Sequence, residues 1–227
     1  MKPKISQLVS QLIVVFIIFA SALFIPAGTM AWPAGWVFLA LFFGFSIFTF
    51  TWLSLHNPDL LKERMRLGTS DQKGWDKILF PLLQIVLLAW LVCMGLDTGR
   101  FHWSHLPIWL QGVGGLILLC SFYLLFLTFR ENSYLSPVVR LQKDRGQSVI
   151  SSGPYHHLRH PMYCAILIFI VGTSLLLGSG YSVIVGLIGI LILARRAVLE
   201  EAVLLQELSG YADYTAQVRY HFIPYIW

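Results

Sequence analysis

The sequence has little charge and few cysteines. Charged residues make up only 12% of the 227 residues, whereas hydrophobic residues make up 57% and the mean hydropathy is +0.71. Water-soluble globules carry more charge, and disordered chains are far less hydrophobic, so both classes are excluded. The three cysteines, Cys93, Cys120 and Cys164, lie far apart in apolar stretches. Their spacing allows neither a disulfide framework nor a CxxC metal site, and we expect core or lipid-facing thiols.

The sequence also lacks a continuous basic surface. Its formal charge of +5 comes from Lys and Arg residues in short loops between apolar runs, and these residues form no stripe interleaved with aromatics. A nucleic-acid-binding surface needs such a stripe, so we expect no nucleic-acid partner. The distribution instead indicates a membrane protein surrounded by lipids.

Long apolar runs are abundant. Four of them, near residues 8–26, 36–55, 78–96 and 108–129, are long enough to cross about 30 Å of hydrocarbon. A fifth, 161–194, is broken only by Gly178-Ser179-Gly180, which predicts a helical hairpin. The first run is expected to be a retained helix, because no small-residue cleavage site follows it. The sequence therefore predicts an all-α integral membrane protein with about six transmembrane helices.

The basic residues also predict the orientation of the chain. With six spans, the N-terminus, the 56–77 and 130–160 loops and the C-terminal tail share one face. This face carries every Lys and Arg except Arg100, which lies in the 98–107 loop. Because basic loops stay in the cytoplasm, we expect a multi-pass protein with both termini cytoplasmic.

The composition divides the chain into two parts. Residues 1–129 form a predicted four-span transmembrane region with one polar loop, whereas residues 130–227 concentrate His, Arg, Glu and Tyr. The second part comprises a cytoplasmic loop, the 161–194 hairpin, and a C-terminal amphipathic helix and tail. We therefore expect the chemistry, including a cytoplasmic cofactor-binding region, in residues 130–227.

The first candidate motif ends the 130–160 loop, which is long enough to suggest a function. It reads Gly153-Pro154-Tyr155, then Arg159-His160-Pro161-Met162-Tyr163. Pro161 suits the first turn of the next helix, whose exposed N–H groups would favour an anionic ligand group near Arg159. Alternatively, these are interfacial residues, with Arg159 as a lipid-phosphate anchor. His156, His157 and His160 lack a further ligand at typical spacing, so no metal site is expected.

The second candidate motif follows the sixth predicted span. Arg196 and Glu200 are one helical turn apart and share a face, and Glu201 follows directly. Acidic residues this close to a membrane boundary are costly unless they are solvated or partnered, and one of them could hold a cationic or amino ligand. The alternative is a membrane-surface helix with an exposed Arg196–Glu200 pair.

Together the two motifs resemble the isoprenylcysteine carboxyl methyltransferases, a family of integral-membrane enzymes related to phospholipid N-methyltransferases. The resemblance covers residues 130–227, where the Gly153-to-Tyr163 motif is followed, after one hairpin, by Glu200-Glu201 and Gly210-Tyr211. It implies S-adenosylmethionine bound on the cytoplasmic side under a C-terminal lid, and a lipophilic methyl acceptor that enters from the bilayer. Arg196 would be catalytic and face the acceptor, and Arg140 is a weaker cofactor contact. The cofactor-binding residues that it implies are Gln147, Ser148, Val149, Ile150, Tyr155, His160, Pro161, Met162, Tyr163 and Glu200.

The residues leave two alternatives to the methyltransferase. An NADPH-dependent membrane sterol or enone reductase can carry a similar His-Pro-x-Tyr run, but usually with an acidic residue soon after it, where this chain has Cys164 and Ala165. A small transporter would place ionisable residues at mid-span, and the first four predicted spans have almost none. The methyl acceptor stays open among a prenylated thioether carboxylate, a lipid amine, a quinone-like phenol and a small thiol.

Overall fold

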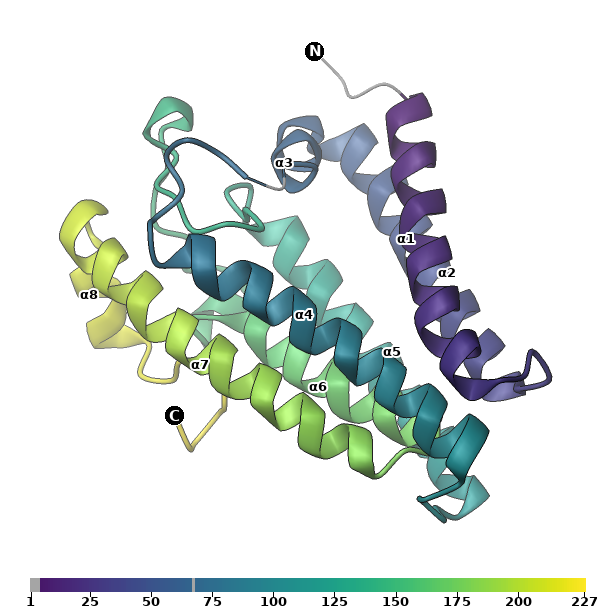
Figure 1. Cartoon of the computed structure of the whole chain (residues 1–227). Helices are drawn as coiled ribbons and strands as arrows, with labels where there is room; N and C mark the ends of the chain where they lie inside the picture. The colour runs from purple at the N-terminus through teal and green to yellow at the C-terminus, as the bar shows by residue number, and fades with distance from the viewer. Residues whose placement is uncertain (1–4, 67) are drawn as a thin grey trace.

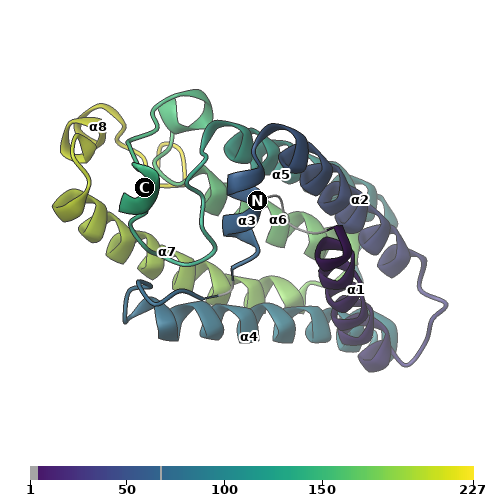
Figure 2. The same ribbon diagram turned by 90° about the horizontal axis from the view of Figure 1, so that it is seen from above.

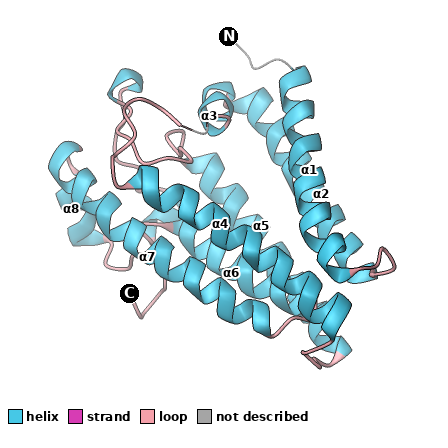
Figure 3. Cartoon of the chain, viewed as in Figure 1, coloured by secondary structure: helices cyan, strands magenta, loops and turns pink. Residues whose placement is uncertain are grey.

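The protein is built from helices. The computed structural model describes residues 5–66 and 68–227, and in this part of the chain it contains no strand (Figures 1 and 3). Lys2 and Lys4, which contribute to the predicted orientation, lie outside the described residues. The long helices are α1 (Ile5–Ala27), α2 (Pro33–His56), α4 (Asp76–Met94), α5 (Ile108–Glu131), α6 (Pro161–Leu176) and α7 (Tyr181–Glu207). The shorter elements are α3 (Pro58–Arg64), α8 (Tyr211–Gln217), the π-helix η1 (Gly95–Phe101) and the 3-10 turns η2 (Lys143–Arg145) and η3 (Gly153–His156). The all-α prediction is confirmed.

Five helices are long and apolar enough to cross a membrane, judged by length and composition. They are α1, α2, α4 with η1, α5 and α7. Helix α6, the remaining predicted span, is apolar but has only 16 residues. The six apolar segments therefore exist as helices, and six crossings remain a prediction.

The predicted hairpin has the expected break but a longer second helix. Helix α6 ends at Leu176, Gly178 turns the chain with φ +76°, and α7 begins at Tyr181. Helix α7 then continues to Glu207, so the amphipathic segment expected after residue 194 is part of α7. Residues 195–207 are mostly strong helix formers without Gly or Pro, which explains this continuity.

Helices α5 and α6 approach each other closely because small residues lie between them. A side chain on Gly114 would collide with the backbone of Leu175 and Leu176, and one on Gly172 would meet the backbone of Leu118. The Ser121 hydroxyl adds a 2.8 Å hydrogen bond to the carbonyl of Ala165. Close backbone packing of this kind is a common way for helices to associate in lipid.

The α1–α2 pair stands beside the α4–α7 group, as the two views show (Figures 1 and 2). Helix α1 contacts η1, where Gly95 and Gly99 meet the backbone at Leu23 and Ala27. Helix α2 packs on α5 through stacked rings of Phe45 and Phe122, 4.4 Å apart. The apolar core thus joins all six long helices, while many outward side chains of α1 remain exposed.

The helices have two ends of different character. At the far end, the chain reverses through residues 28–32, 102–107 and 177–180. The opposite end, which we call the site end, carries α3, the 132–160 loop, α8 and the C-terminal tail.

The three cysteines are free, with Cys164 buried, Cys93 partly buried and Cys120 exposed, as their apolar surroundings predict.

Candidate active site

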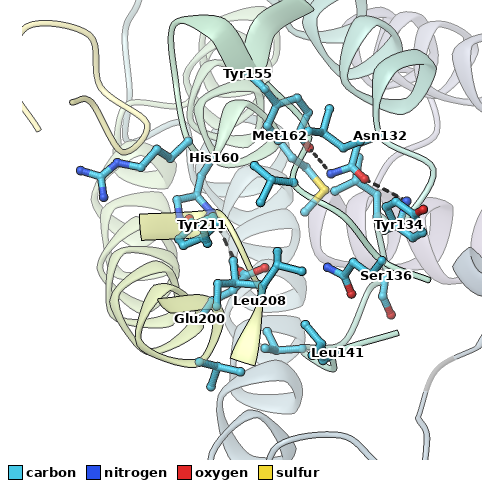
Figure 4. Close-up of a pocket in the computed structure, with 18 of the residues that line it drawn as sticks. Asn132, Tyr134, Ser136, Leu141, Tyr155, His160, Met162, Glu200, Leu208 and Tyr211 are labelled. Atoms are coloured by element: carbon cyan, nitrogen blue, oxygen red, sulfur yellow. Dashed lines mark hydrogen bonds and ion pairs between the residues drawn. The ribbon is translucent and has the colours of Figure 1, made fainter. Parts of the chain in front are cut away.

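A cavity at the site end is bordered by the 132–150 loop, the start of α6, α7 and α8 (Figure 4). It is lined by nearly all the residues that the resemblance implies: Gln147, Ser148, Val149, Ile150, Tyr155, His160, Met162, Tyr163, Arg196 and Glu200. Pro161 is the exception, since it is buried in the first turn of α6 and does not line the cavity. Two segments far apart in sequence, 147–163 and 196–200, therefore meet at one place.

The adjacent glutamates Glu200 and Glu201 point to different surroundings. Glu200 lines the cavity with its side chain 27% exposed, accepts a 2.7 Å hydrogen bond from the Tyr163 hydroxyl, and has His160 Nδ1 at 4.0 Å. Glu201 is 8% exposed and is paired with Arg159 Nη1 at 2.7 Å and His160 Nε2 at 3.0 Å. Of the described residues that line the cavity, Glu200 is the only one with a carboxylate.

The Glu201 cluster holds the C-terminal tail in place. His221 Nε2 lies 3.1 Å from Glu201 Oε2. The backbone N–H groups of Arg159 and His160 donate to the carbonyls of Tyr220 and His221 at 2.9 and 2.7 Å. Arg159 is therefore an internal ion-pair partner, whereas its sequence neighbourhood suggested a ligand contact or a lipid anchor.

Arg196 is held by a residue that sequence reasoning missed. Its Nε donates to Asp76 Oδ1 at 2.7 Å, and its Nη2 donates to the Pro137 carbonyl at 2.7 Å. Its Nη1 lies 3.3 Å from the Tyr163 hydroxyl, which in turn donates to Glu200. Arg196 and Glu200 do share the cavity, but they are connected through Tyr163 instead of forming a surface pair.

Buried tyrosines form another wall of the cavity. Asn132 Nδ2 donates to the Tyr155 hydroxyl at 2.9 Å, and the Tyr214 hydroxyl donates to the Tyr155 carbonyl at 2.7 Å. Burial raises the pKa of Tyr155, Tyr211 and Tyr214 above the usual value, so all three hydroxyls stay neutral at physiological pH. They present aromatic faces and hydrogen-bonding groups without adding negative charge.

Arg140 lines the cavity but is committed to a buried ion pair. Its Nε and Nη2 donate to both carboxylate oxygens of Glu63 at 2.8 and 2.9 Å, and its Nη1 reaches Asp71 at 2.8 Å. Burial alone would raise the pKa of Glu63, but the bonds and charge of Arg140 outweigh it and lower that pKa. This geometry fixes the 132–150 loop to α3, and it leaves the cofactor contact suggested for Arg140 without an obvious free donor.

Several lining residues carried a weaker signal in the sequence. Tyr211 and Tyr214 lie in the segment that carries the resemblance but were assigned no role, and Asn132 was expected only as a loop residue. Asp76 does not line the cavity but binds Arg196, and it is an acidic residue at the start of an apolar run, which is the same signal that singled out Glu200 and Glu201. Among residues 5–66 and 68–227 no group of three or more His, Cys, Asp or Glu is arranged to hold a metal ion.

Comparisons with known proteins place the cavity in context. Residues 110–210, which contain both sequence motifs up to Gly210, match the phospholipid methyltransferase family. The fold matches a eukaryotic intramembrane Ras methyltransferase, isoprenylcysteine carboxyl methyltransferase, with a TM-score of 0.65 and 21% sequence identity. The match covers 92% of this chain and 73% of that chain. A search of curated proteins finds no match to this chain.

These findings confirm the resemblance that the two motifs predicted. Residues 110–210 are similar to the phospholipid methyltransferase family, and the fold is like that of isoprenylcysteine carboxyl methyltransferase. Its apolar helices and its integral-membrane structural neighbour also support a multi-pass membrane protein.

Proposed function

We propose that the protein is an S-adenosylmethionine-dependent membrane methyltransferase that acts on a lipophilic acceptor. The observation that carries this proposal is the position of Glu200. Its carboxylate lines the cavity and has only the Tyr163 hydroxyl as a close partner, whereas the other buried charges of the site are paired internally. The family match and the fold support methyl transfer as the reaction.

The residues of the cavity fit this cofactor. When bound, S-adenosylmethionine supplies an electrophilic methyl group on a cationic sulfonium. A cation is stabilised by a carboxylate and by aromatic faces, which Glu200, Tyr155 and Tyr163 provide. The proposed binding residues are Gln147, Ser148, Val149, Ile150, Tyr155, His160, Met162, Tyr163 and Glu200, with Pro161 fixing the start of α6.

The site would act mainly by positioning. Methyl transfer is an in-line displacement that needs an aligned nucleophile and little proton chemistry, so no catalytic triad is required. The aromatic rings of Tyr155 and Tyr163 and the apolar side chains of Val149 and Leu208 line the cavity, and they would limit the access of water to a bound cofactor. Arg196 is the proposed catalytic residue, because its Nη1 faces the cavity beside Tyr163 and can hold the acceptor.

For the acceptor, we favour the carboxylate of an isoprenylcysteine-type substrate. A guanidinium forms strong hydrogen bonds to carboxylates, which suits Arg196. The structural neighbour is described as a Ras methyltransferase. The description of the matched family, phospholipid methyltransferase, favours a phospholipid acceptor instead. Incubating the purified protein with radiolabelled S-adenosylmethionine and a total lipid extract, then identifying the labelled fraction, decides between these acceptors.

Cofactor binding tests the proposal directly. Calorimetry in detergent should show that S-adenosylhomocysteine binds and that NADPH does not. Because Glu200 is proposed to contact the cationic sulfonium, Glu200→Gln should weaken the binding of S-adenosylmethionine by about 1.5 to 3 kcal/mol, or roughly ten- to a hundredfold. Glu207→Gln is the matched control, since Glu207 lies on the same helix but pairs with Lys73 at the surface. NADPH binding in place of S-adenosylhomocysteine would support the reductase.

We also propose that both termini are cytoplasmic and that the chain crosses the membrane six times. The basic loops lie at the site end, and Arg100 lies in η1 at the far end. Reporter fusions at Trp227 and within the 98–107 loop should report opposite sides of the membrane. Fusions that report the same side would show that α6 or an early helix does not cross.

A further inference from the structure

Asp76 is a buried carboxylate at the first residue of α4, in the 56–77 segment that the sequence predicted as a polar loop. Its exposed fraction is 0%. Its Oδ1 accepts from Arg196 Nε at 2.7 Å, and its Oδ2 accepts from the Val139 N–H at 2.8 Å and from Gln72 Nε2 at 3.0 Å. The carboxylate therefore connects α4 with α7 and with the 132–150 loop.

These bonds determine which part of Arg196 is available to the cavity. Asp76 binds the edge of the guanidinium formed by Nε and Nη2, with Nη2 at 3.4 Å from Oδ2. The Pro137 carbonyl also accepts a hydrogen bond from Nη2, at 2.7 Å. Because the guanidinium is planar, a partner on this edge fixes the direction of the remaining nitrogen, Nη1. That nitrogen is the one that lies 3.3 Å from the Tyr163 hydroxyl.

The same carboxylate shapes the wall beside Arg196. Val138 and Val139 line the cavity, and the Val139 N–H donates to Asp76, while Pro137 accepts from Arg196. A shift of Asp76 would therefore move the guanidinium and the 137–139 backbone together. Both face the part of the cavity to which we assign the methyl acceptor.

We infer that Asp76 is a positioning residue for methyl transfer. It orients Arg196 Nη1 and holds the 137–139 backbone in place beside the acceptor. This role rests on the proposed function. Asp76 does not line the cavity, so it acts through Arg196 and touches neither substrate. Its loss should impair turnover and acceptor binding while leaving the Glu200 side of the cavity able to bind the cofactor.

Asp97 offers a matched control at the far end. It is also 0% exposed and lies in η1, which continues α4. It accepts from neutral donors: the Ser104 N–H at 2.8 Å, the Ser104 hydroxyl at 2.7 Å and the Ser179 hydroxyl at 2.6 Å. Asp97→Asn and Asp76→Asn therefore make the same chemical change in two buried carboxylates, only one of which contacts Arg196.

The experiment measures methyl transfer from labelled S-adenosylmethionine to an S-prenylcysteine and, separately, to phosphatidylethanolamine vesicles, and uses whichever acceptor is labelled. Asp76→Asn should lower kcat/KM for the acceptor by about thirtyfold or more, with the Kd of S-adenosylhomocysteine changed by less than about threefold. Asp97→Asn should lower the thermal midpoint but keep kcat/KM within about threefold of the parent. Parent-like transfer by Asp76→Asn would overturn the role.

A double-mutant cycle separates positioning from general destabilisation. If Asp76 acts through Arg196, adding Asp76→Asn to Arg196→Lys should lower kcat/KM by less than about threefold further. Additive losses would overturn the role. If Asp76→Asn does not fold, Asp76→Glu keeps the charge but displaces the guanidinium. Parent-like kcat/KM in Asp76→Glu would then overturn it.

The two proposals fail in distinguishable ways. A parent protein that binds no S-adenosylhomocysteine and labels neither acceptor overturns the proposed function, and the Asp76 role with it. A parent protein that is active while Asp76→Asn is equally active overturns only the role of Asp76.

Discussion

The two ends of the helices are stabilised by different forces. At the far end, Asp97 accepts hydrogen bonds from two serines, and Gly114 and Gly172 let α5 and α6 approach to backbone contact. At the site end, buried charges are paired over long sequence distances, as in Asp76–Arg196 and Glu201–Arg159. The far end is therefore held by close packing and by hydrogen bonds from neutral donors to Asp97, and the site end by ion pairs.

This difference explains where ligands can bind. At the far end, the buried carboxylate of Asp97 is already occupied, because it accepts hydrogen bonds from Ser104 and Ser179. The ion pairs of the site end join α3, the 132–150 loop, α4 and α7 around the cavity, and Glu200 lines that cavity. Fixed polar groups of this kind would suit the binding of a cationic cofactor as proposed above.

The largest stability loss should come from breaking the ion-pair cluster at the site end. Glu201→Gln leaves Arg159, which is 12% exposed, without its carboxylate partner. Removing one partner of a buried pair costs about 3 kcal/mol or more, because the remaining charge stays desolvated. We expect a lower thermal midpoint in detergent and faster proteolysis of the C-terminal tail. A midpoint unchanged from that of Glu207→Gln would show that Glu201 does not stabilise this end.

A smaller loss is expected at the far end from Gly114→Ala. The added methyl group meets the backbone of Leu175 and Leu176, which cannot move aside as a side chain would. Overpacking of this kind costs about 1 to 3 kcal/mol. Gly112→Ala is the control on the same helix, since its added methyl meets nothing within 4 Å. Equal thermal midpoints for the two variants would contradict the close packing of α5 against α6.

The sequence predicted the helices better than the connections between them. Apolar runs end where loops begin, so the limits of α2 and α5 and the break at residues 177–180 followed from composition. The meeting of residues 147–163 with Arg196 and Glu200 came from the resemblance, since nothing in their spacing fixes how the loop folds back. The contact between Asp76 and Arg196 spans 120 positions and depends on how α4 packs beside α7, which local patterns do not encode.

The sequence also could not predict that Glu200 and Glu201 have different surroundings. The two residues are adjacent, so periodicity only indicates that they face different directions around a helix. Which of them meets the cavity depends on where the 218–227 tail returns, and that tail is positioned by backbone bonds to Arg159 and His160. Tertiary contacts pair Glu201 with Arg159 and His160 and leave Glu200 in the lining of the cavity.

The smallest expected effect is a pH dependence confined to the tail at the site end. His221 is stacked on Trp227 and lies 3.1 Å from Glu201 Oε2. Burial lowers its pKa, Glu201 raises it, and the positive charge of Arg159 and the neighbouring His160 lower it again, so the docked pKa lies below the usual 6.5. As the pH falls, His221 is therefore protonated at a higher pH in the released tail than in the docked tail. Docking is fully favoured above pH 6.5 and weakens as the pH drops through the docked pKa.

Carboxypeptidase digestion or amide exchange of residues 221–227 can measure this docking. Both should be about two- to fivefold faster at about pH 5.5 than at about pH 7.5, after correction for intrinsic rates. His221→Gln removes the titrating group and should flatten this dependence, while exchange at the far end stays unchanged with pH in both proteins. A tail that opens equally at both pH values in the parent protein, or an acid effect that persists in His221→Gln, would show that the ion pairs of Glu201 hold the tail without help from the protonation state of His221.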